Sequence, residues 1–265
     1  LSLPIPTSPG RSGFGPQLSL AYNSGAGNGP FGFGWQLSLA SISRKTDLGL
    51  PQYFDSQESD TFILSNAEDL VPEFEEDGAG GWVMDGDEHV VFDKPYSVEG
   101  ADYRVRRYRP RVEGLFARIE RWTRADGDVH WRSISRDNTL TIYGNDTTAR
   151  IADPADGRRV FSWLISETRD DKGNAVVYEY KHDDCVGAKL TQLHERNRGP
   201  LNDPRRRVNR YLKRILYGNR APLLDGAGQR PHFLTPAALN GASWMFEIVF
   251  DYDDHDLAHP APRDD

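Results

Sequence analysis

A glycine-rich segment near the start of the chain has the spacing of a phosphate-binding loop. Gly27-Asn-Gly-Pro-Phe-Gly32 matches the pattern G-x-G-x-x-G, in which the glycines bring a pyrophosphate to a helix N-terminus. That chemistry needs a helix after the glycines, but Phe31-Gly-Phe-Gly-Trp35 leads into another alternating segment. We therefore predict that Gly27, Gly29 and Gly32 form a tight turn and serve folding rather than a ligand.

Other residues that could do chemistry are present without the spacing that it requires. Two acidic groups could offer oxygen atoms to Ca²⁺, but both lack the pattern of an EF-hand loop: Asp251, Asp253, Asp254 and Asp256, and Asp85, Asp87 and Glu88. The one close histidine pair suited to zinc, His255 and His259, falls in the C-terminal tail, which we expect to be disordered. Neither a P-loop nor the nucleophile motif G-x-S-x-G occurs. A glycosidase with two paired carboxylates stays open as a minor alternative, although nothing in the sequence selects a pair. We predict no catalytic, cofactor-binding or metal residues, and hence that the chain is not an enzyme.

The remaining reactive or charged groups are interpreted as structural. Cys185 is the single cysteine, so the chain forms no internal disulfide, and its acidic neighbours disfavour a reactive thiolate. The basic cluster follows a predicted loop and is interpreted as a solvated strand edge, with a docking patch for an acidic partner as the alternative: Arg205, Arg206, Arg207, Arg210, Lys213 and Arg214.

Charge and hydropathy exclude two classes of partner. The formal net charge of −8 argues against nucleic acid. No apolar run approaches the ~20 residues that cross a bilayer, so we expect no direct membrane insertion. The chain begins at Leu1 and is soon interrupted by prolines. We therefore expect that the chain carries no classical signal peptide and that it is a piece of a longer protein or a processed product.

The elements that must position these residues are strands. Gln-Leu-Ser-Leu-Ala occurs at Gln17–Ala21 and again at Gln36–Ala40, and the Leu-Ser-Leu core also opens the chain at Leu1–Leu3. Leucines that alternate with small or polar residues are typical of a strand with one buried face. We predict strands laid side by side and joined by the glycine-rich crossing.

The rest of the chain predicts an all-β fold with little helix. Short alternating segments rich in β-branched and aromatic residues indicate serial antiparallel hairpins that form a curved sheet. Further strands are expected at 61–64, 82–84, 89–92, 103–108 and 243–252, with an acidic loop at 72–81. We predict one domain over 1–256, made of a block at 1–72, hairpins at 82–220 and a long connection at 221–240, followed by a tail at 257–265.

Two hairpins can be predicted in detail. Leu115–Ser135 contains Asp126-Gly127, the signature of a two-residue type I′ turn. That turn would place Trp122 opposite Trp131, and Ile119 opposite Ile134, so that both faces carry apolar side chains.

The second hairpin spans Arg159–Tyr180, with its turn at Asp170–Asn174. Tyr-Gly-Asn recurs at Tyr143–Asn145 and Tyr217–Asn219, each time closing an apolar strand. Repetition of this kind indicates that each hairpin buries its face on the next one.

A long motif identifies a family that the chain resembles. The stretch Leu3–Trp35, with Ser41-Ile-Ser-Arg-Lys-Thr-Asp47 and Ser65–Pro72, closely resembles the start of the SpvB-like domain. That domain occurs in the B component of bacterial Tc toxin complexes and in a Salmonella plasmid virulence protein. The later hairpins are similar to RHS/YD repeats.

The resemblance implies a secreted, insecticidal toxin component. It implies a place in the wall of a hollow β-sheet shell, completed by an RHS-containing C component and enclosing a cytotoxic effector. The shell would dock on the pore-forming A component through a propeller. Neither a propeller, an effector, the self-cleaving RHS motif nor an ADP-ribosyltransferase signature is evident in the sequence.

Two functions follow as hypotheses. The first is a non-catalytic structural domain of a toxin shell; the second is a surface module that binds glycan or protein through exposed aromatic rings. Burial of the tryptophans favours the shell, and a cluster of exposed rings favours binding: Trp35, Trp82, Trp122, Trp131, Trp163 and Trp244.

Overall fold

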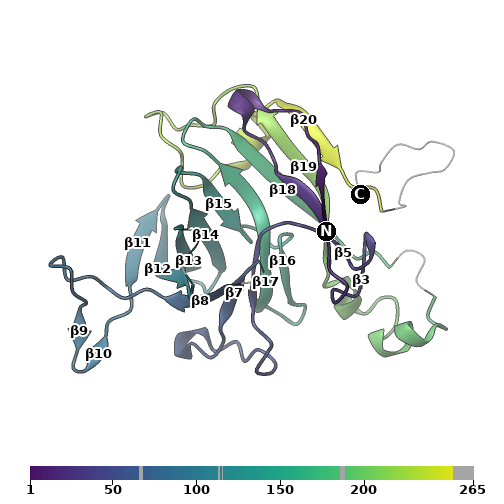
Figure 1. The fold of residues 1–265 in the computed structure, drawn as a ribbon, viewed down its shortest axis with the longest axis horizontal. Helices are drawn as coiled ribbons and strands as arrows, with labels where there is room; N and C mark the ends of the chain where they lie inside the picture. Colours follow the sequence, from purple (N-terminus) through teal and green to yellow (C-terminus); the bar gives the residue numbers. More distant parts are fainter. Residues whose placement is uncertain (66–67, 113, 115, 186–188, 253–265) are drawn as a thin grey trace. The chain divides into compact units, whose positions relative to one another are not determined.

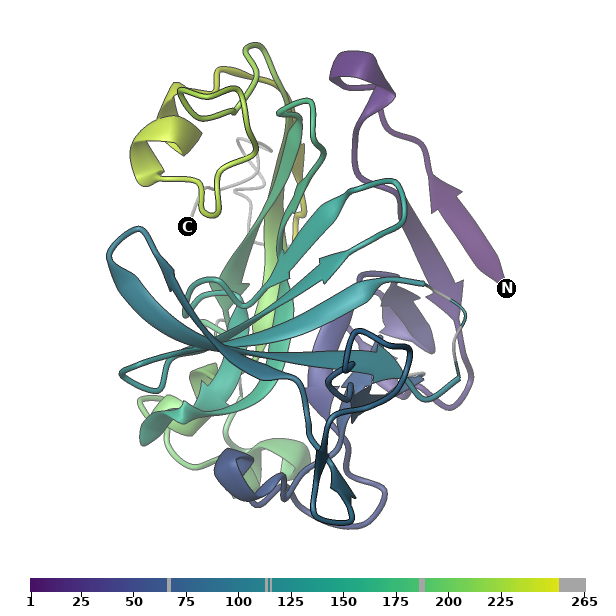
Figure 2. The same ribbon diagram turned by 90° about the vertical axis from the view of Figure 1, so that its left-hand side faces the viewer.

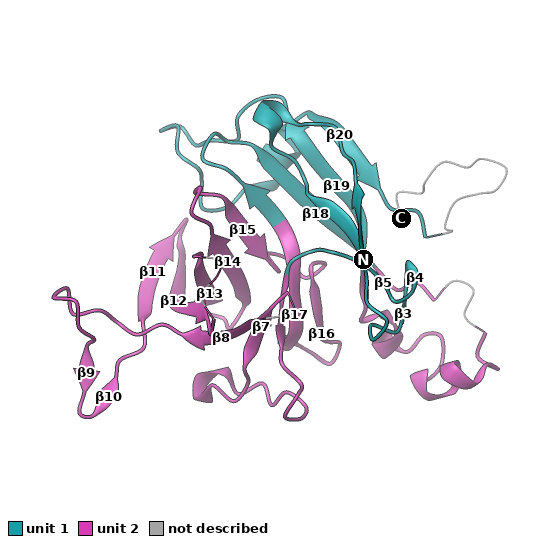
Figure 3. Ribbon diagram, viewed as in Figure 1, with its two compact units in different colours: residues 1–40, 167–181, 211–265 teal, residues 41–166, 182–210 magenta. Residues whose placement is uncertain are grey.

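Strands dominate the computed structural model, which describes residues 1–65, 68–112, 114, 116–185 and 189–252. Strands make up 45% of the chain and helices 9% (Figure 1). This confirms the predicted all-β class with antiparallel hairpins and little helix. The contacts divide the chain into two compact units, each taken from separated segments (Figure 3).

Unit 2, residues 41–166 and 182–210, contains a closed ring of strands. Neighbouring strands pair in the order β15-β14-β13-β12-β8-β7-β6-β17, and β15 also pairs with β17, which closes the ring. Its strands are β6 (Ser41–Arg44), β7 (Phe62–Leu64), β8 (Glu68–Pro72), β12 (Ala101–Pro110), β13 (Arg118–Arg124), β14 (Val129–Ile134), β15 (Leu140–Tyr143) and β17 (Asp156–Arg169). We call this ring the barrel.

Aromatic side chains fill the interior of the barrel. Phe62 lies with its ring centroid 4.9 Å from Trp131 and 5.9 Å from Trp163, and Tyr108 lies 5.0 Å from Trp131. These rings come from strands that are not neighbours in the ring, so they meet across its interior. An eight-stranded barrel is just wide enough to be filled in this way.

The first predicted hairpin forms, but its register is shifted by one residue. Trp122 pairs with His130 and Arg121 with Trp131, so the predicted Trp122–Trp131 pair is wrong. The predicted pair of Ile119 with Ile134 is wrong for the same reason, because Ile119 faces Ser133.

The physical cause of the shift is the turn. Gly127 takes a φ of +90° but Asp126 does not take a positive φ, as a type I′ turn would require of both. The Gly127 N–H instead donates to the Arg124 carbonyl (2.9 Å), which gives a three-residue loop with the glycine last. Trp122 and Trp131 therefore point to opposite faces of the sheet.

Further elements of unit 2 lie outside the ring. β11 (Asp93–Val98) pairs with β12, and β16 (Arg150–Asp153) pairs with β17. β9 (Met84–Asp85) and β10 (Glu88–His89) form a small hairpin that stands apart from the barrel strands in Figure 1. Three short 3₁₀ helices complete the unit at Asp55–Gln57, Leu193–Arg198 and Pro204–Arg207.

Unit 1, residues 1–40, 167–181 and 211–265, contains the doubled motif. β1 (Ser2–Ile5), β2 (Leu18–Tyr22) and β5 (Trp35–Leu37) form one antiparallel sheet, in which Leu20 pairs with Leu37. Figure 2 shows β1 and β2 side by side at the purple end of the colour scale. The prediction that the repeated segments are adjacent strands is confirmed. β3 (Asn28–Gly29) and β4 (Gly32–Phe33) form the glycine-rich crossing, and a 3₁₀ turn lies at Arg11–Gly13.

The second predicted hairpin is confirmed in the same unit. The end of β17 pairs with β18 (Ala175–His182), with Arg169 facing Ala175. β19 (Arg210–Asn219) pairs with β20 (Trp244–Val249), and the connection between them ends in the short helix α1 (Pro236–Gly241). None of the helices among the described residues is long and apolar enough to cross a membrane.

Candidate functional site

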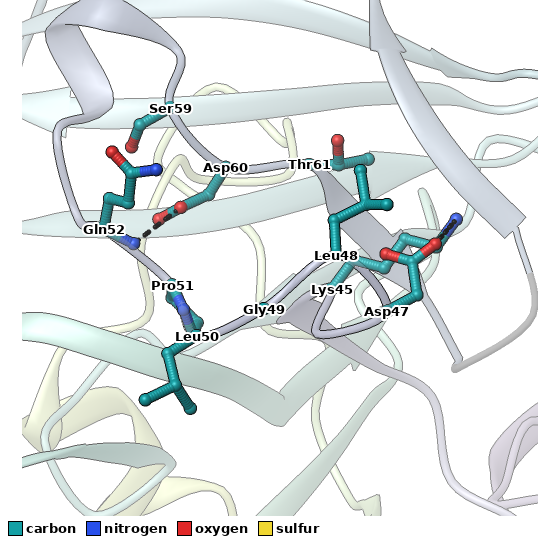
Figure 4. Close-up of a pocket in the computed structure, with 10 residues that line it drawn as sticks. All are labelled: Lys45, Asp47, Leu48, Gly49, Leu50, Pro51, Gln52, Ser59, Asp60 and Thr61. Atoms are coloured by element: carbon teal, nitrogen blue, oxygen red, sulfur yellow. Dashed lines mark hydrogen bonds and ion pairs between the residues drawn. The ribbon is translucent and has the colours of Figure 1, made fainter.

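The most unusual surface feature of unit 2 is the loop that joins β6 to β7. We call residues 45–61 the leucine loop. Leu48 and Leu50 at its tip are 97% and 90% exposed, far beyond the partial exposure common for surface leucines. The loop encloses a shallow pocket of about 90 Å³, lined by its own residues between Lys45 and Thr61 (Figure 4).

A buried arginine fixes the base of this loop. Arg44, the last residue of β6, is 1% exposed. Its Nη1 donates to Asp55 (2.5 Å) and Asp60 (2.7 Å), its Nη2 donates to Asp55 (3.0 Å), and its Nε donates to the Val160 carbonyl (2.8 Å). These charge-assisted bonds tie the carboxylates of Asp55 and Asp60 to the wall of the barrel.

Aromatic rings complete the surroundings of the guanidinium. Arg44 Cζ lies 4.7 Å from the ring centroid of Tyr53, 5.1 Å from Phe62 and 5.4 Å from Trp163. Cation–π contacts of this kind each contribute on the order of 1 kcal/mol. The Arg44 charge is therefore shielded from water by rings and matched by two carboxylates.

Backbone groups of the loop use the same carboxylate. Asp60 accepts hydrogen bonds from the N–H of Gln52 (2.8 Å) and Tyr53 (2.9 Å). Burial alone would raise the pKa of Asp60, but these two bonds and the bond from Arg44 outweigh it and lower that pKa. Asp60 is thus held as a carboxylate whose oxygen atoms are occupied by the loop itself.

A second, exposed ion pair supports the start of the loop. Lys45 Nζ lies 2.8 Å from Asp69 and 3.1 Å from Asp47, and hydrogen bonds to these carboxylates raise the pKa of Lys45. The polar groups of the loop thus hold its shape and leave the two leucines pointing outward. This arrangement can present an apolar tip to another surface.

The three glycines of the G-x-G-x-x-G pattern differ in backbone conformation. Gly27 and Gly32 take φ values of +73° and +96°, as a turn requires. Gly29 does not take a positive φ, and a Cβ there would meet only the Trp35 carbonyl oxygen at 3.5 Å. The backbone therefore favours glycine at positions 27 and 32 but not at position 29, where a role in folding stays a prediction.

The acidic candidates that the structure describes do not assemble into a site. Asp85 and Glu88 face each other across the exposed β9–β10 hairpin. Within the described part of the chain, no group of three or more His, Cys, Asp or Glu residues could hold a metal ion. Asp251 is exposed. Asp253, Asp254, Asp256, His255 and His259 lie outside the described residues.

The basic cluster is not one patch. Arg206 is 1% exposed and pairs with Glu195 at 2.5 Å, and Lys213 is also buried. Arg205 is exposed and pairs with Asp203 at 2.5 Å, while Arg214 pairs with Glu247 at 2.7 Å. Sequence reasoning missed Glu195 and Glu247 because they lie in another helix and another strand, whereas Asp203 is only two residues from Arg205.

Cys185 and the six tryptophans differ in their exposure to solvent. Cys185 is half-buried and its N–H donates to Asp183 (2.9 Å). All six tryptophans lie in the described part of the chain: Trp122, Trp131 and Trp163 are buried, Trp35 and Trp244 are half-buried, and Trp82 is 39% exposed. Trp82 is the one exposed tryptophan, so the tryptophans do not form the exposed cluster that a binding module would need.

Comparison with known proteins covers the whole chain. The family model described as SpvB, Salmonella virulence plasmid 65kDa B protein, matches residues 1–265. A relative from Salmonella typhimurium, mono(ADP-ribosyl)transferase SpvB, is 34% identical over 99% of this chain. A relative of the same name from Salmonella dublin is also 34% identical over 99% of this chain. The chain spans about two fifths of these curated relatives (41% and 40%).

Solved structures show similarity to the same family and to Tc toxin proteins. The N-terminal domain of the effector protein SpvB from Salmonella typhimurium strain LT2 has a TM-score of 0.72 at 34% identity, covering 95% of this chain and 72% of that one. A chain of the TcdB2–TccC3 crystal structure has a TM-score of 0.74 at 30% identity, covering 94% of this chain and 11% of that one. A chain of the Photorhabdus luminescens Tc holotoxin pore has a TM-score of 0.71 at 30% identity, covering 95% and 10%.

One prediction from the sequence is overturned by these relatives. The chain was predicted not to be an enzyme, but its curated relatives are named mono(ADP-ribosyl)transferase, so that prediction is wrong for this family. The predicted resemblance is confirmed, and the chain is similar to structural domains of toxin-complex proteins. The chain belongs to the SpvB family.

Proposed function

We propose that this chain is a wall domain of a toxin shell that encloses a cytotoxic effector and helps to deliver it. The observation that carries the proposal is the leucine loop on a filled barrel whose fold is shared with chains of Tc toxin structures. A barrel filled with aromatic rings offers a rigid block, and an ordered apolar tip offers a contact by which such blocks join.

The proposed partners are other components of a toxin complex. One supporting observation is that TcdB2 and TccC3 occur together in the solved structures that this chain resembles. By analogy, we infer that the partner is an RHS-containing C component, and that a pore-forming A component binds through parts of the protein outside this chain. Delivery outside the bacterial cell belongs to the same proposal, as do an insecticidal role and the RHS-like nature of the hairpins.

The leucine loop makes the proposal specific. Leu48 and Leu50 would bury most of their side chains on assembly, and full burial of a leucine contributes on the order of 2 kcal/mol. Two such residues on a loop that Arg44 already holds rigid lose little conformational entropy when they bind. We therefore place the leucine loop at a contact between this wall domain and the rest of the shell.

The test uses the full-length protein and its C component, purified together and imaged by electron microscopy. Closed hollow particles with the barrel in their wall are expected. A variant with Leu48→Asp and Leu50→Asp should form far fewer closed particles, because each carboxylate would be buried without a partner. Val112→Asp, at another exposed apolar position (68%) of unit 2, is the matched control.

Two results would contradict the proposal. If the barrel hangs from the particle as a separate appendage, the chain is not a wall domain. If the double leucine variant and the Val112→Asp control assemble equally well, the leucine loop is not the contact. The alternative of a glycan- or protein-binding module would gain support if binding depended on the exposed Trp82.

A further inference from the structure

A second arginine lies inside the barrel, and its charge is not matched. Arg121 on β13 is 7% exposed. Its Cζ lies 5.6 Å from the ring centroid of Phe62 and 5.7 Å from that of Tyr108. Its cross-strand neighbour Trp131 is fully buried and packs on the same Phe62 ring. Arg121 is therefore part of the aromatic interior.

Arg44 shows how the same barrel pairs another buried arginine. In the same barrel, Arg44 donates to two carboxylates and one backbone carbonyl. Within the residues that the structure describes, no carboxylate forms an ion pair with Arg121, and its Nε and Nη1 are buried without a hydrogen-bond acceptor. A buried guanidinium without a counter-charge is strongly unfavourable, and cation–π contacts offset only part of that cost.

Other donors surround the same place. Trp131 Nε1 is buried and has no acceptor in the described part of the chain. The Tyr108 ring lies 5.0 Å from that of Trp131, and burial raises the pKa of Tyr108, so its hydroxyl stays protonated. Phe62 thus lies between two guanidinium groups: Arg44, which the carboxylates of Asp55 and Asp60 already match, and Arg121, whose N–H donors and that of Trp131 lack an acceptor among the described residues. Donors left over beside an unmatched positive charge are suited to an anion.

We propose that the barrel interior binds a small inorganic anion of the halide class beside Arg121. Such an ion accepts several hydrogen bonds from any direction and supplies the missing negative charge. A buried water molecule could accept the same bonds but would leave the charge unmatched. An interior so closely packed with rings admits at most a monatomic ion and no organic ligand.

The first experiment measures thermal unfolding against chloride. The sample is the full-length protein. Sodium chloride is exchanged for sodium gluconate at constant ionic strength, because gluconate is too large for the filled interior. An ion that binds only the folded state should raise Tm by about 5 °C at a hundredfold excess over its Kd.

Variants assign the effect to Arg121. Arg121→Met should abolish the dependence of Tm on chloride, since the methionine keeps the apolar stem and removes the charge. Arg158→Met, on β17 with a side chain 75% exposed, is the matched control and should keep that dependence. Equal Tm values in chloride and gluconate, or an unchanged chloride dependence in Arg121→Met, would overturn the proposal.

A second measurement keeps the proposal testable if Arg121→Met does not fold. Crystals of the unaltered chain are soaked in sodium bromide, and anomalous diffraction is recorded at the bromine edge. A peak beside Arg121 and Trp131 Nε1 inside the barrel is the expected result. Density without anomalous signal would identify water there and refute the anion. Neither measurement depends on shell assembly, so this inference and the proposed function fail or succeed separately.

Discussion

Replacing Asp60 by asparagine should loosen the leucine loop from the barrel. Asp60→Asn keeps the size of the side chain but removes its charge. The Asp60 carboxylate accepts from Arg44 at 2.7 Å and from the N–H groups of Gln52 and Tyr53 at 2.8 and 2.9 Å. An asparagine has one acceptor oxygen for these three donors, and its NH₂ group would face another donor.

The magnitude follows from the burial of the pair. The side chains of Arg44 and Asp60 are 1% and 5% exposed, and removing one partner of a buried ion pair typically costs about 3–5 kcal/mol. Asp55 still accepts from two nitrogens of Arg44, so the lower end applies. We expect a loss of about 3 kcal/mol in the free energy of unfolding, or a fall of about 6–12 °C in Tm.

Urea unfolding followed by tryptophan fluorescence measures this loss directly, because Trp163 lies beside Arg44. Asp47→Asn is the matched control: Asp47 is 52% exposed and pairs with Lys45 at the surface, so its loss should leave stability nearly unchanged. If Asp60→Asn and Asp47→Asn unfold at the same urea concentration, Arg44 does not anchor the loop through Asp60.

Three further changes test other parts of the fold. Gly144 has a φ of +63°, and a Cβ there would lie 2.4 Å from Trp163 Cδ1. Gly144→Ala should therefore lower the free energy of unfolding, measured with a chemical denaturant, by about 3 kcal/mol. Gly157→Ala, at a position with open space around it, should lower it far less. Burial holds the pKa of His130 well below 6.5, so below that pH the unfolded chain binds a proton that the folded chain does not. Between pH 6.5 and 5 the free energy of unfolding of the unaltered chain should therefore fall by about 2 kcal/mol more than that of His130→Gln. Asn219 is fully buried and donates to two backbone carbonyls at 2.7 and 2.8 Å, so Asn219→Asp should lower Tm sharply at pH 7 and less at pH 4, where the new carboxyl regains a proton.

Sequence patterns predicted the strands that bury one face. The repeated Gln-Leu-Ser-Leu-Ala segments form paired strands because alternation defines which face is apolar. The turn at Asp170–Asn174 was predicted correctly because Gly173 takes a positive φ of +76°. β6 was not predicted, because Arg44 shares a strand face with Ile42 and a charged residue normally indicates the exposed face.

The leucine loop could not have been assembled from the sequence. Asp55 and Asp60 lie 11 and 16 residues beyond Arg44, and nothing in that spacing shows that the chain turns back. The pairing exists because β6 and β7 are adjacent strands, which brings both ends of the loop to one edge of the barrel. The two exposed leucines were visible in the sequence, but only a fixed loop base distinguishes them from a flexible tip.

The shifted hairpin register shows why a barrel of this kind contains buried charge. Because β13 and β14 carry apolar groups on both faces, the predicted register and the observed one both bury tryptophan, and hydrophobic patterning alone scarcely distinguishes them. Directional contacts distinguish the two registers. Arg150 donates to Asp128 through two hydrogen bonds of 2.5 and 3.1 Å, and Trp163 Nε1 donates to the Val129 carbonyl at 2.9 Å. A slip of one residue would move Asp128 and reverse the direction of the Val129 carbonyl, leaving the buried Arg150 unpaired at a cost of several kcal/mol. We infer that the interior polar groups specify the register, and that apolar residues in their place would give a barrel of similar stability with a less certain strand alignment.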